Sequence, residues 1–444
     1  MPSSSVRHSL ALGADIPAAV RTPARAERPG PLTGPSIGWG GHRGRPAEGV
    51  RRRPESEVDP PMTCPPLPHH PDAPAGTAPQ ARPEDAFRAE DERFVARLHA
   101  ELEEFFGRQR AVLGGISADA LPLLDAVVAL SAGGTRLRAR LCYWGWRAAG
   151  GDPEDPAVVR AGAALELFQS AALIHDDVID RSDTRRGAPS VHRRFESVHA
   201  DRGWALDGPA FGVAAAILSG DLCLSWSEQS FAAATTTAPG GHRARAVFDL
   251  MRSEVMAGQY LDVQGEVAGG GQDRDGAVQR ALDVIRYKSA KYSVEHPVVL
   301  GAALAGAPEP VLERCSAFAL PLGEAFQLRD DVLGVFGDPA ATGKPAGDDL
   351  REGKRTVLVG YVRTLGSEPQ VARLEDALGR PDLTEEDVEE LRALITACGA
   401  LASTEELIER LSREAFAALD RLGAEDVPMA ALRGLATAAV RRSS

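Results

Sequence analysis

The sequence contains no asparagine, and its five cysteines are scattered without a CxxC pair. Scattered cysteines argue against a disulfide framework or a zinc cage, and they fit a reducing cytosol. No apolar run approaches the roughly 18–20 residues that a membrane span needs, so we expect no membrane span and a cytoplasmic location. Basic residues are in the minority: the formal net charge of −13 argues against nucleic acid as a partner.

The first 83 residues differ in composition from the rest of the chain. They hold about half of its 32 prolines, are rich in Gly, Ala and Arg, and show no helical or strand period. Such a segment buries too little apolar surface to offset its ordering entropy, and its Arg-rich start resembles a transit peptide only superficially. We expect a disordered extension over 1–83 without a catalytic role, and Met62 is a candidate for the true start.

Residues 84–444 are rich in Ala, Leu, Glu and Arg, with apolar residues three and four apart and no alternating strand pattern. This spacing predicts helices, and a chain of 444 residues with 43% hydrophobic content can bury a large core. The clearest predicted helices cover 91–106, 157–179, 247–264, 311–335 (interrupted at Pro321) and 403–422. We therefore expect one all-α domain over 84–444.

A cluster of three carboxylates ends the apolar helix predicted over 157–179. Asp176 and Asp180 are four residues apart and share one face of the helix, with Asp177 beside them. Like charges this close repel one another, so a cation must compensate them. Oxygen ligands without His or Cys favour Mg²⁺, which takes phosphate oxygens and waters as its other ligands. The alternative is a solvated acidic helix end.

A second pair of carboxylates, Asp330 and Asp331, follows Gln327 late on another apolar helix. Two such helices facing each other would line a cavity with carboxylates, and Mg²⁺ ions held between them would clamp one diphosphate. Metal ions stabilise the charge that develops on a departing diphosphate. The second cluster therefore favours a catalytic role for the first cluster over a solvated acidic helix end.

Basic residues flank both clusters, and arginine suits bidentate phosphate recognition while lysine acts as a point charge. Each one alone is more often a solvated surface charge, but together they predict a site for two anionic substrates. They are found in Gly133-Gly134-Thr135-Arg136-Leu137-Arg138, Arg185-Arg186-Gly187, Lys288-Ser289 with Lys291, Gly343-Lys344-Pro345 and Gly353-Lys354-Arg355.

This set of motifs resembles the trans-prenyl diphosphate synthases, the polyprenyl synthetase family, in the order of that family, and the region from Gly334 to Thr356 resembles its actinobacterial geranylgeranyl diphosphate synthases. The resemblance extends over roughly residues 95–420 and includes Gly258-Gln259 with Asp262. It implies a single-domain helical bundle around a central cavity, similar to isoprenoid synthases. It also implies a homodimer and a Mg²⁺-dependent prenyltransferase that condenses isopentenyl diphosphate with an allylic diphosphate by ionisation, condensation and proton loss.

The resemblance also assigns roles to residues. Asp176, Asp180 and Asp330 would ligate Mg²⁺, three ions in all, with Asp177 and Asp331 in support. The allylic diphosphate would be held by Arg185, Lys288, Ser289, Gln327 and Lys344. Isopentenyl diphosphate would be held by Arg138, Gln169, Arg186 and the backbone of Gly134 and Thr135.

Two positions depart from the pattern of the family. Thr135 stands where a lysine is usual, which costs a charge-assisted hydrogen bond of about 1.5–3 kcal/mol, and Arg136 is expected to compensate. Gly334 replaces the last aspartate of the second cluster, and Asp338, or Asp348 and Asp349 in the following loop, are expected to assist. Gly334 is not interpreted as inactivation, whereas Thr135 keeps the terpene cyclase alternative open.

The length of the product depends on the helix that ends at Asp176. Ala172 and Ala171, four and five residues before Asp176, are too small to block a tunnel along this helix. Phe168 lies one turn deeper on about the same face as Ala171 and is the candidate floor. This arrangement suggests a medium product such as geranylgeranyl diphosphate. Farnesyl diphosphate and longer products stay open, as does ordinary core packing of Phe168.

Two other functions remain as alternatives. A class I terpene cyclase would share the first cluster, but its second metal motif contains asparagine, which this chain lacks. A non-catalytic subunit of a hetero-oligomeric synthase would have lost metal ligands, yet the first cluster is complete. Both alternatives therefore rank below the synthase.

Overall fold

The structure, a computed structural model, describes residues 82–268, 274–337 and 347–440, and all of these fall in one compact unit. The predicted all-α class is confirmed, because helices account for nearly all regular structure in the described residues. The first helix begins at Pro83. The extension predicted over 1–83 therefore lies almost wholly outside the described residues.

The elements follow one another along the chain with short connections. The first half contains α1 (Pro83–Ile116), η1 (Ala118–Ala120), α2 (Leu121–Ser131), α3 (Leu137–Ala148), α4 (Pro156–Ile179), β1 (Thr184–Arg185), β2 (Ala188–Pro189), α5 (Val191–Asp201), α6 (Gly208–Thr237) and α7 (Gly241–Ala268). The second half contains α8 (Ala277–Val284), the π-helix η3 (Ile285–Glu295), α9 (His296–Leu304), α10 (Glu309–Phe336), α12 (Asp348–Glu352), α13 (Val357–Leu365), α14 (Glu368–Ala377), α15 (Glu385–Ala397), α16 (Ala400–Leu419) and α17 (Asp426–Val440).

The predicted helices correspond to α1, α4, α7, α10 and α16, but two local predictions differ from the structure. The interruption at Pro321 is wrong, because α10 continues through this proline. A proline inside a helix removes one backbone hydrogen bond, and the packing of α10 against η3 and α16 compensates for that loss. The sequence analysis did not predict the π-helix η3, because such helices are rare. Where they do occur, they are frequently found at functional sites.

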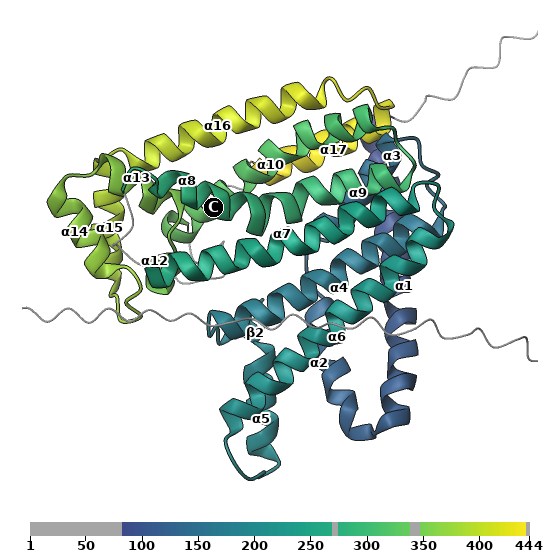
Figure 1. The fold of residues 1–444 in the computed structure, drawn as a ribbon, viewed down its shortest axis with the longest axis horizontal. Coiled ribbons are helices and arrows are strands. Elements are labelled where there is room, and N and C mark those ends of the chain that lie inside the picture. Colours follow the sequence, from purple (N-terminus) through teal and green to yellow (C-terminus); the bar gives the residue numbers. More distant parts are fainter. Residues whose placement is uncertain (1–81, 269–273, 338–346, 441–444) are drawn as a thin grey trace, which may run out of the picture. The chain divides into compact units, whose positions relative to one another are not determined.

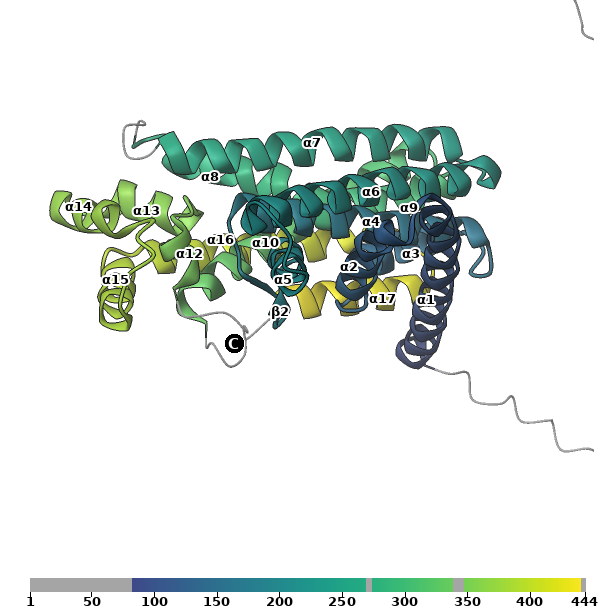
Figure 2. The same ribbon diagram turned by 90° about the horizontal axis from the view of Figure 1, so that it is seen from below.

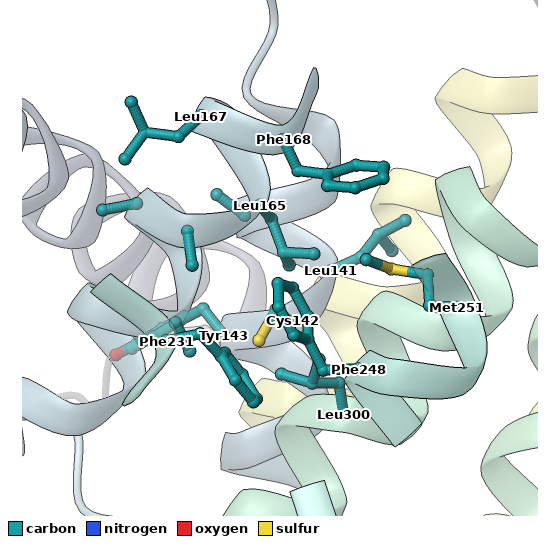
Figure 3. Packing of buried hydrophobic residues seen from close by; sticks show 14 of the residues in the cluster. Leu141, Cys142, Tyr143, Leu165, Leu167, Phe168, Phe231, Phe248, Met251 and Leu300 are labelled. Carbon is teal, nitrogen blue, oxygen red and sulfur yellow. The ribbon is translucent and has the colours of Figure 1, made fainter. Parts of the chain in front are cut away.

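Two clusters of buried apolar side chains hold the helices together. The larger one joins α1, α2, α3, α4, α6, α7 and α9, and Figure 3 shows part of it around Phe168 and Met251. The smaller one joins α8, α10, α13, α15 and α16. In Figures 1 and 2, α12 to α15 gather at one end of the bundle and α1 and α3 at the other. The carboxyl ends of α4, α7 and α10 point toward the end that holds α12.

Two helices are more apolar than the sequence analysis allowed. Windows of α4 and α6 reach a mean hydropathy of 1.4, long and apolar enough for a membrane span by length and composition alone. In α4, 72% of that window is buried inside the protein, and in α6 44% is buried. Core helices of this kind pass the same test, so these two helices are weak evidence for a span.

Candidate functional site

The first acidic cluster lies at the carboxyl end of α4. This helix begins at Pro156 after Asp155, whose side chain accepts a hydrogen bond from the backbone N–H of Ala157. At the other end, the Asp176 carboxylate accepts a hydrogen bond from Gln259 Nε2 at 3.2 Å and lies 3.7 Å from Lys288 Nζ. Asp176 thus faces Gln259 of α7 and Lys288 of η3.

Asp177 has a different orientation from Asp176. Its side chain is buried, and its Oδ1 accepts a hydrogen bond from Arg185 Nε at 2.8 Å, with a second contact from the same guanidinium. Arg185 belongs to the short hairpin β1–β2 and also lies 3.7 Å from an oxygen of Asp176. Asp177 therefore anchors Arg185 and fixes its guanidinium beside the first cluster, while its support of metal binding stays a prediction.

Lys288 enters the site because α7 and η3 approach closely at Gly258. A Cβ at this position would lie 2.3 Å from the backbone nitrogen of Lys288, so only glycine fits. Lys288 Nζ then lies 2.5 Å from Asp262 Oδ2. Burial alone lowers the pKa of Lys288, but Asp262 and Asp176 outweigh it, so the pKa is raised and the ammonium stays charged. Ser289 follows on the same turn and is half-buried.

Two carboxyl groups in this region titrate well above their ordinary range. Burial, then the charge of Asp176, raise the pKa of Asp180 to about 6. Burial, then Asp262 and Asp180, raise the pKa of Glu266 to about 7. Burial is the largest cause of both shifts, and the neighbouring carboxylates add to it; a bound cation would favour the charged forms of both groups.

Gln259, Asp262 and Glu266 also contribute contacts or charge to this region, and the sequence analysis assigned no role to them. They are separated by three and four residues and so share one face of α7. This spacing was the available signal, but Gly258-Gln259 and Asp262 entered only as part of a resemblance. Their roles depend on contacts with α4 and η3 that are distant in sequence.

The second cluster lies at the carboxyl end of α10. Gln327 Nε2 donates a hydrogen bond to Asp331 Oδ1 at 2.9 Å, and the Asp331 side chain is buried. Burial, then the charge of Asp349, raise the pKa of Asp331 to about 8. Asp330 is half-buried at the adjacent position. Gln327 therefore orients Asp331. The contact of Gln327 with the allylic diphosphate stays a prediction.

The glycine that departs from the family pattern now has a physical explanation. A Cβ on Gly334 would lie 2.0 Å from Asp349 Oδ2. The carboxylate of Asp349, at the start of α12, therefore occupies the space that a side chain at position 334 would need. Asp349 is thus close to the second cluster, and its assistance there stays a prediction; Asp338 lies outside the described residues.

Lys354 brings a further cation to the two clusters. Its Nζ lies 2.5 Å from Glu352 Oε2 and 3.6 Å from Asp349 Oδ1. Burial opposes its charge, but Asp349 and Glu352 outweigh burial and raise the pKa of Lys354, with a smaller contribution from Asp180. The sequence analysis noted this lysine without giving it a role, while Lys344, to which it gave one, lies outside the described residues.

We call the set formed by Asp176, Asp180, Asp262, Glu266, Asp330, Asp331 and Asp349 the acidic half of the site. Within the described residues no group of three or more His, Cys, Asp or Glu side chains is already placed as a metal cage. Mg²⁺ does not require such a cage, because it usually binds one or two carboxylates and completes its shell with substrate phosphates and waters. The donor set, all oxygen with uncompensated negative charge, fits this ion.

A basic half lies next to it, made of the turn 133–138 together with Arg186. The Arg186 guanidinium donates hydrogen bonds to the carbonyl oxygens of Gly133 at 2.7 Å and Leu130 at 2.9 Å, and it lies against Gly134. Burial, then the charge of Arg136, lower the pKa of Arg186. The backbone of Gly134 and the guanidinium of Arg186 thus converge, as predicted, and Thr135 is exposed beside them.

Arg138 and Gln169 meet at one aromatic residue, Tyr292 of η3. The Arg138 guanidinium lies 4.4 Å from the centroid of the Tyr292 ring and donates a hydrogen bond to Ser293 Oγ at 2.7 Å. The Tyr292 hydroxyl donates a hydrogen bond to Gln169 Oε1 at 2.5 Å. Tyr292, which the sequence analysis missed, therefore positions two side chains that were predicted to hold isopentenyl diphosphate.

The compensating role expected for Arg136 is wrong. Its side chain is buried, lies 2.8 Å from Glu166 Oε2, and contacts the carbonyl oxygen of Ser131. A guanidinium committed to a buried carboxylate in this way is not available to replace the lysine that is missing at Thr135. Arg136 and Arg138 differ by only two positions in the sequence, but they point to different surroundings.

The candidate floor, Phe168, lies in an aromatic cluster. Its ring makes edge contacts with Tyr292 at 5.5 Å and Phe248 at 6.5 Å between centroids, and Phe248 stacks on Phe231. Figure 3 shows the Phe168 ring extending toward Met251 of α7. Ala171 is fully buried above it, and Ala172 is half-buried. The geometry is compatible with a tunnel floor and equally with core packing.

Fold and site together define an all-helical protein that gathers carboxylates at helix ends beside a cluster of arginines. Residues 123–395 match the model of the Polyprenyl synthetase family. The chain therefore belongs to this family, whose related members are prenyl diphosphate synthases, and it is a prenyltransferase. The resemblance stated from the sequence is confirmed.

Relatives of known name differ in the product they are named for. A geranylgeranyl diphosphate synthase of Sulfolobus acidocaldarius is 31% identical over 334 residues, covering 74% of this chain and 93% of that protein. A geranylfarnesyl diphosphate synthase of Aeropyrum pernix is 31% identical over 300 residues, covering 67% and 86%. The structure of a geranylgeranyl pyrophosphate synthase from Corynebacterium glutamicum, complexed with isoprenyl diphosphate and magnesium, is 36% identical with a TM-score of 0.74, covering 79% and 99%.

Proposed function

We propose that the protein catalyses the Mg²⁺-dependent condensation of isopentenyl diphosphate with an allylic diphosphate to give a longer all-trans prenyl diphosphate. The observation that supports this most is the division of the site into an acidic and a basic half. The acidic half needs cations, which suits a diphosphate that arrives with metal ions. The basic half already presents guanidinium groups, which suit a diphosphate that binds without metal.

Asp176 and Asp180 on one side and Asp330 on the other would hold the Mg²⁺ ions. When bound, Mg²⁺ supplies neutralisation of the charge that develops on the leaving diphosphate. Lys288 and Lys354 are fixed as charged groups at the same place, and they add fixed positive charge that needs no reorganisation during the reaction. The number of ions, three, is part of the proposal; the related structure that is complexed with magnesium supports the use of this metal.

The test of this activity incubates the full chain with Mg²⁺ and isopentenyl diphosphate. In parallel reactions, dimethylallyl, geranyl or farnesyl diphosphate is the allylic substrate. Products are dephosphorylated and identified by gas chromatography–mass spectrometry. We expect allylic alcohols that contain added five-carbon units, only when isopentenyl diphosphate is present. Cyclic hydrocarbons that form without isopentenyl diphosphate would instead support the terpene cyclase alternative and overturn the proposal.

Geranylgeranyl diphosphate is our proposed product, with Phe168 as the floor of the tunnel. Replacing Phe168 with Ala removes the ring while keeping the fully buried Ala171 above it. If the ring is the floor, Phe168→Ala makes products longer by at least one five-carbon unit. Phe231→Ala, a change of the same size in the same aromatic cluster but on α6, is the matched control. Unchanged product length in Phe168→Ala would assign this ring to core packing.

We also propose a homodimer in the cytoplasm. Within the described residues, α6 and α7 expose several large apolar side chains, which a second copy of the chain would cover. They are Ile217, Leu218, Leu250, Met256 and Tyr260. Sedimentation equilibrium of the wild type and of Leu218→Glu tests this, because a charge in such an interface should dissociate the dimer.

A further inference from the structure

Three buried polar side chains join η3 to α7 and belong to neither half of the site. Glu254 of α7 accepts a hydrogen bond from Lys291 Nζ at 2.6 Å through Oε1, and another from His296 Nε2 at 2.6 Å through Oε2. The side chains of Lys291 and Glu254 are each 17% exposed, and that of His296 is 6% exposed. We call this group the Glu254 clamp. The proposed reaction gives it no function.

The two residues that share the Glu254 carboxylate are five positions apart, which is the spacing of one π-helical turn. The backbone N–H of His296 donates a hydrogen bond to the carbonyl oxygen of Lys291, and this i→i+5 bond defines a π-helix. In an α-helix, residues three or four apart lie above one another, so side chains five apart point to different sides. A single carboxylate that binds both residues therefore fits the π-helical register and not the α-helical one.

The same five-residue spacing allows η3 to contact both halves of the site. Lys288 Nζ lies 2.5 Å from Asp262 Oδ2 in the acidic half. Five residues later, Ser293 Oγ accepts a hydrogen bond from Arg138 of the basic half at 2.7 Å. In an α-helix the positions of Lys288 and Ser293 would point to different sides, and one of the two contacts would be lost.

The other ion pair between η3 and a neighbouring helix is of a different kind. η3 packs between α7 and α10, and Arg286 near its start pairs with Glu324 of α10 at 2.7 Å. This carboxylate binds one residue of η3, whereas Glu254 binds two residues one π-helical turn apart. Because π-helices are rare, their register needs contacts that favour it over the α-helical one, and the Glu254 clamp is such a contact.

We propose that Glu254 is a positioning residue for the condensation, an inference that rests on the proposed function. By joining Lys291 and His296, its carboxylate keeps η3 in the π-helical register. This register places Lys288 in the acidic half and Ser293 beside Arg138 in the basic half. Glu254 thus acts on the reaction through side chains of η3 and not through a substrate contact of its own.

The protonation of the clamp decides which substitutions break it. Burial lowers the pKa of His296, and the hydrogen bond to Glu254 only partly opposes this shift, so the imidazole is neutral at pH 7. Glu254→Gln can still accept a hydrogen bond from Lys291 and can donate one to the neutral imidazole. Glu254→Met has a similar length and makes neither bond. His296→Phe is a milder second variant, because it keeps the ion pair with Lys291 and removes only the bridge.

Amide hydrogen exchange of the full chain, followed in overlapping peptides by mass spectrometry, tests the register without turnover. In Glu254→Met and His296→Phe we expect the amides of residues 288–296 to exchange about tenfold faster than in the wild type, and Glu254→Gln should recover most of the protection. Glu324→Met is the matched control, and it should speed exchange only around Arg286. Unchanged exchange over 288–296 in both Glu254→Met and His296→Phe overturns the proposal. Far-ultraviolet circular dichroism checks that each variant is folded.

Steady-state kinetics at saturating isopentenyl diphosphate test the positioning. Glu254→Met should lower kcat/KM for the allylic diphosphate by about tenfold or more, and Glu324→Met should lower it little. In protein that already carries Lys288→Met, the loss caused by Glu254→Met should nearly vanish, because Glu254 acts through this lysine. Additive losses would mean that the clamp only stabilises the fold, and they would overturn the positioning role. A wild type without synthase activity would contradict the proposed function instead, and hydrogen exchange would then decide the role of the clamp in the register.

Discussion

The two halves of the site are neighbours with opposite electrostatic imbalance. In the acidic half, burial and nearby carboxylates raise the pKa of Asp180 to about 6 and that of Glu266 to about 7. In the basic half, burial and nearby arginines lower the pKa of Arg186. Burial thus pushes each group toward its neutral form, and neighbouring charges of the same sign as the group add to the shift: carboxylates in the acidic half and guanidinium groups in the basic half.

This difference indicates two ways to hold the same chemical group. In the reaction that we propose, cations would bring a diphosphate to the acidic half, and that half would hold the metal-bound diphosphate. The basic half presents Arg138 and Arg186 directly, and an added metal would be repelled there. In the proposed reaction, the sign of the local charge would keep the two diphosphates distinct.

The largest effect is expected from removing a carboxylate of the acidic half. Asp176→Asn keeps the shape of the side chain but loses the charge that faces Lys288 at 3.7 Å. We expect kcat/KM to fall by about 10²–10³, as for the loss of one transition-state contact, with little change in KM for isopentenyl diphosphate. Steady-state kinetics with each substrate varied would check this. Asp201→Asn, at the exposed end of α5, is the control, and a comparable loss there would point to a general charge effect.

A second prediction concerns the exchange between Gly334 and Asp349. Gly334→Asp restores the residue that is usual in the family, but its Cβ would lie 2.0 Å from the carboxylate of Asp349. We expect a loss of about 1–3 kcal/mol in the free energy of unfolding from overpacking, measured by denaturant titration, and lower activity despite the added carboxylate.

The double variant Gly334→Asp/Asp349→Gly separates the two explanations. If Asp349 fills the space of the missing side chain, the double variant recovers stability relative to Gly334→Asp, since the clash is gone. Additive losses in the double variant would show that the two positions do not interact.

How much of this site the sequence could reveal depends on how local each contact is. The spacing of Asp176 and Asp180 on one helix face follows from helix periodicity, so the first cluster was predictable. The contact of Asp349 with the space beside Gly334 was not, because it depends on how α12 packs against α10. Arg136 was misassigned because its backbone is left-handed, with φ of 55°, and this turns the side chain toward Glu166 rather than the site.

The fold shows the same contrast between features set by the local sequence and features set by contacts of distant residues. The apolar spacing located α4, α7 and α10 well, since burial of one helix face is a local pattern. It failed at Pro321, where tertiary packing outweighs the helix-breaking tendency of proline, and it gave no sign of the π-helix that carries Lys288. Contacts between distant elements decide both features.

The basic half is tested by restoring the cation that it lacks. Thr135→Lys places an ammonium on the exposed turn beside Arg186, where Arg136 cannot substitute for it. One charge-assisted hydrogen bond is worth about 1.5–3 kcal/mol, so we expect KM for isopentenyl diphosphate to fall by about tenfold. Thr135→Met, similar in length without the charge, should leave KM unchanged. A fall in KM for the allylic substrate instead would break the division into two halves.

The smallest effect concerns the pH dependence of the acidic half in the absence of metal. The pKa of Glu266 in the folded protein, about 7, exceeds the ordinary value of a glutamate, about 4.3. The folded state therefore holds the proton more tightly than the unfolded state. The stability this contributes is complete below about pH 4 and is lost as pH rises through about 7.

Glu266→Gln stays neutral at every pH and so escapes this loss. In EDTA, Glu266→Gln should become more stable relative to the wild type as pH rises from 5 to 8. The free energy of unfolding of the variant minus that of the wild type should increase by about 1 kcal/mol once solvent screening is allowed for. Glu309→Gln, at the exposed start of α10, should show no such trend. Since saturating Mg²⁺ with diphosphate supplies the missing positive charge, it should abolish the trend in the wild type. A difference that stays constant with pH would mean that the lysines already neutralise the acidic half, and the contrast between the two halves would then be one of geometry rather than of charge.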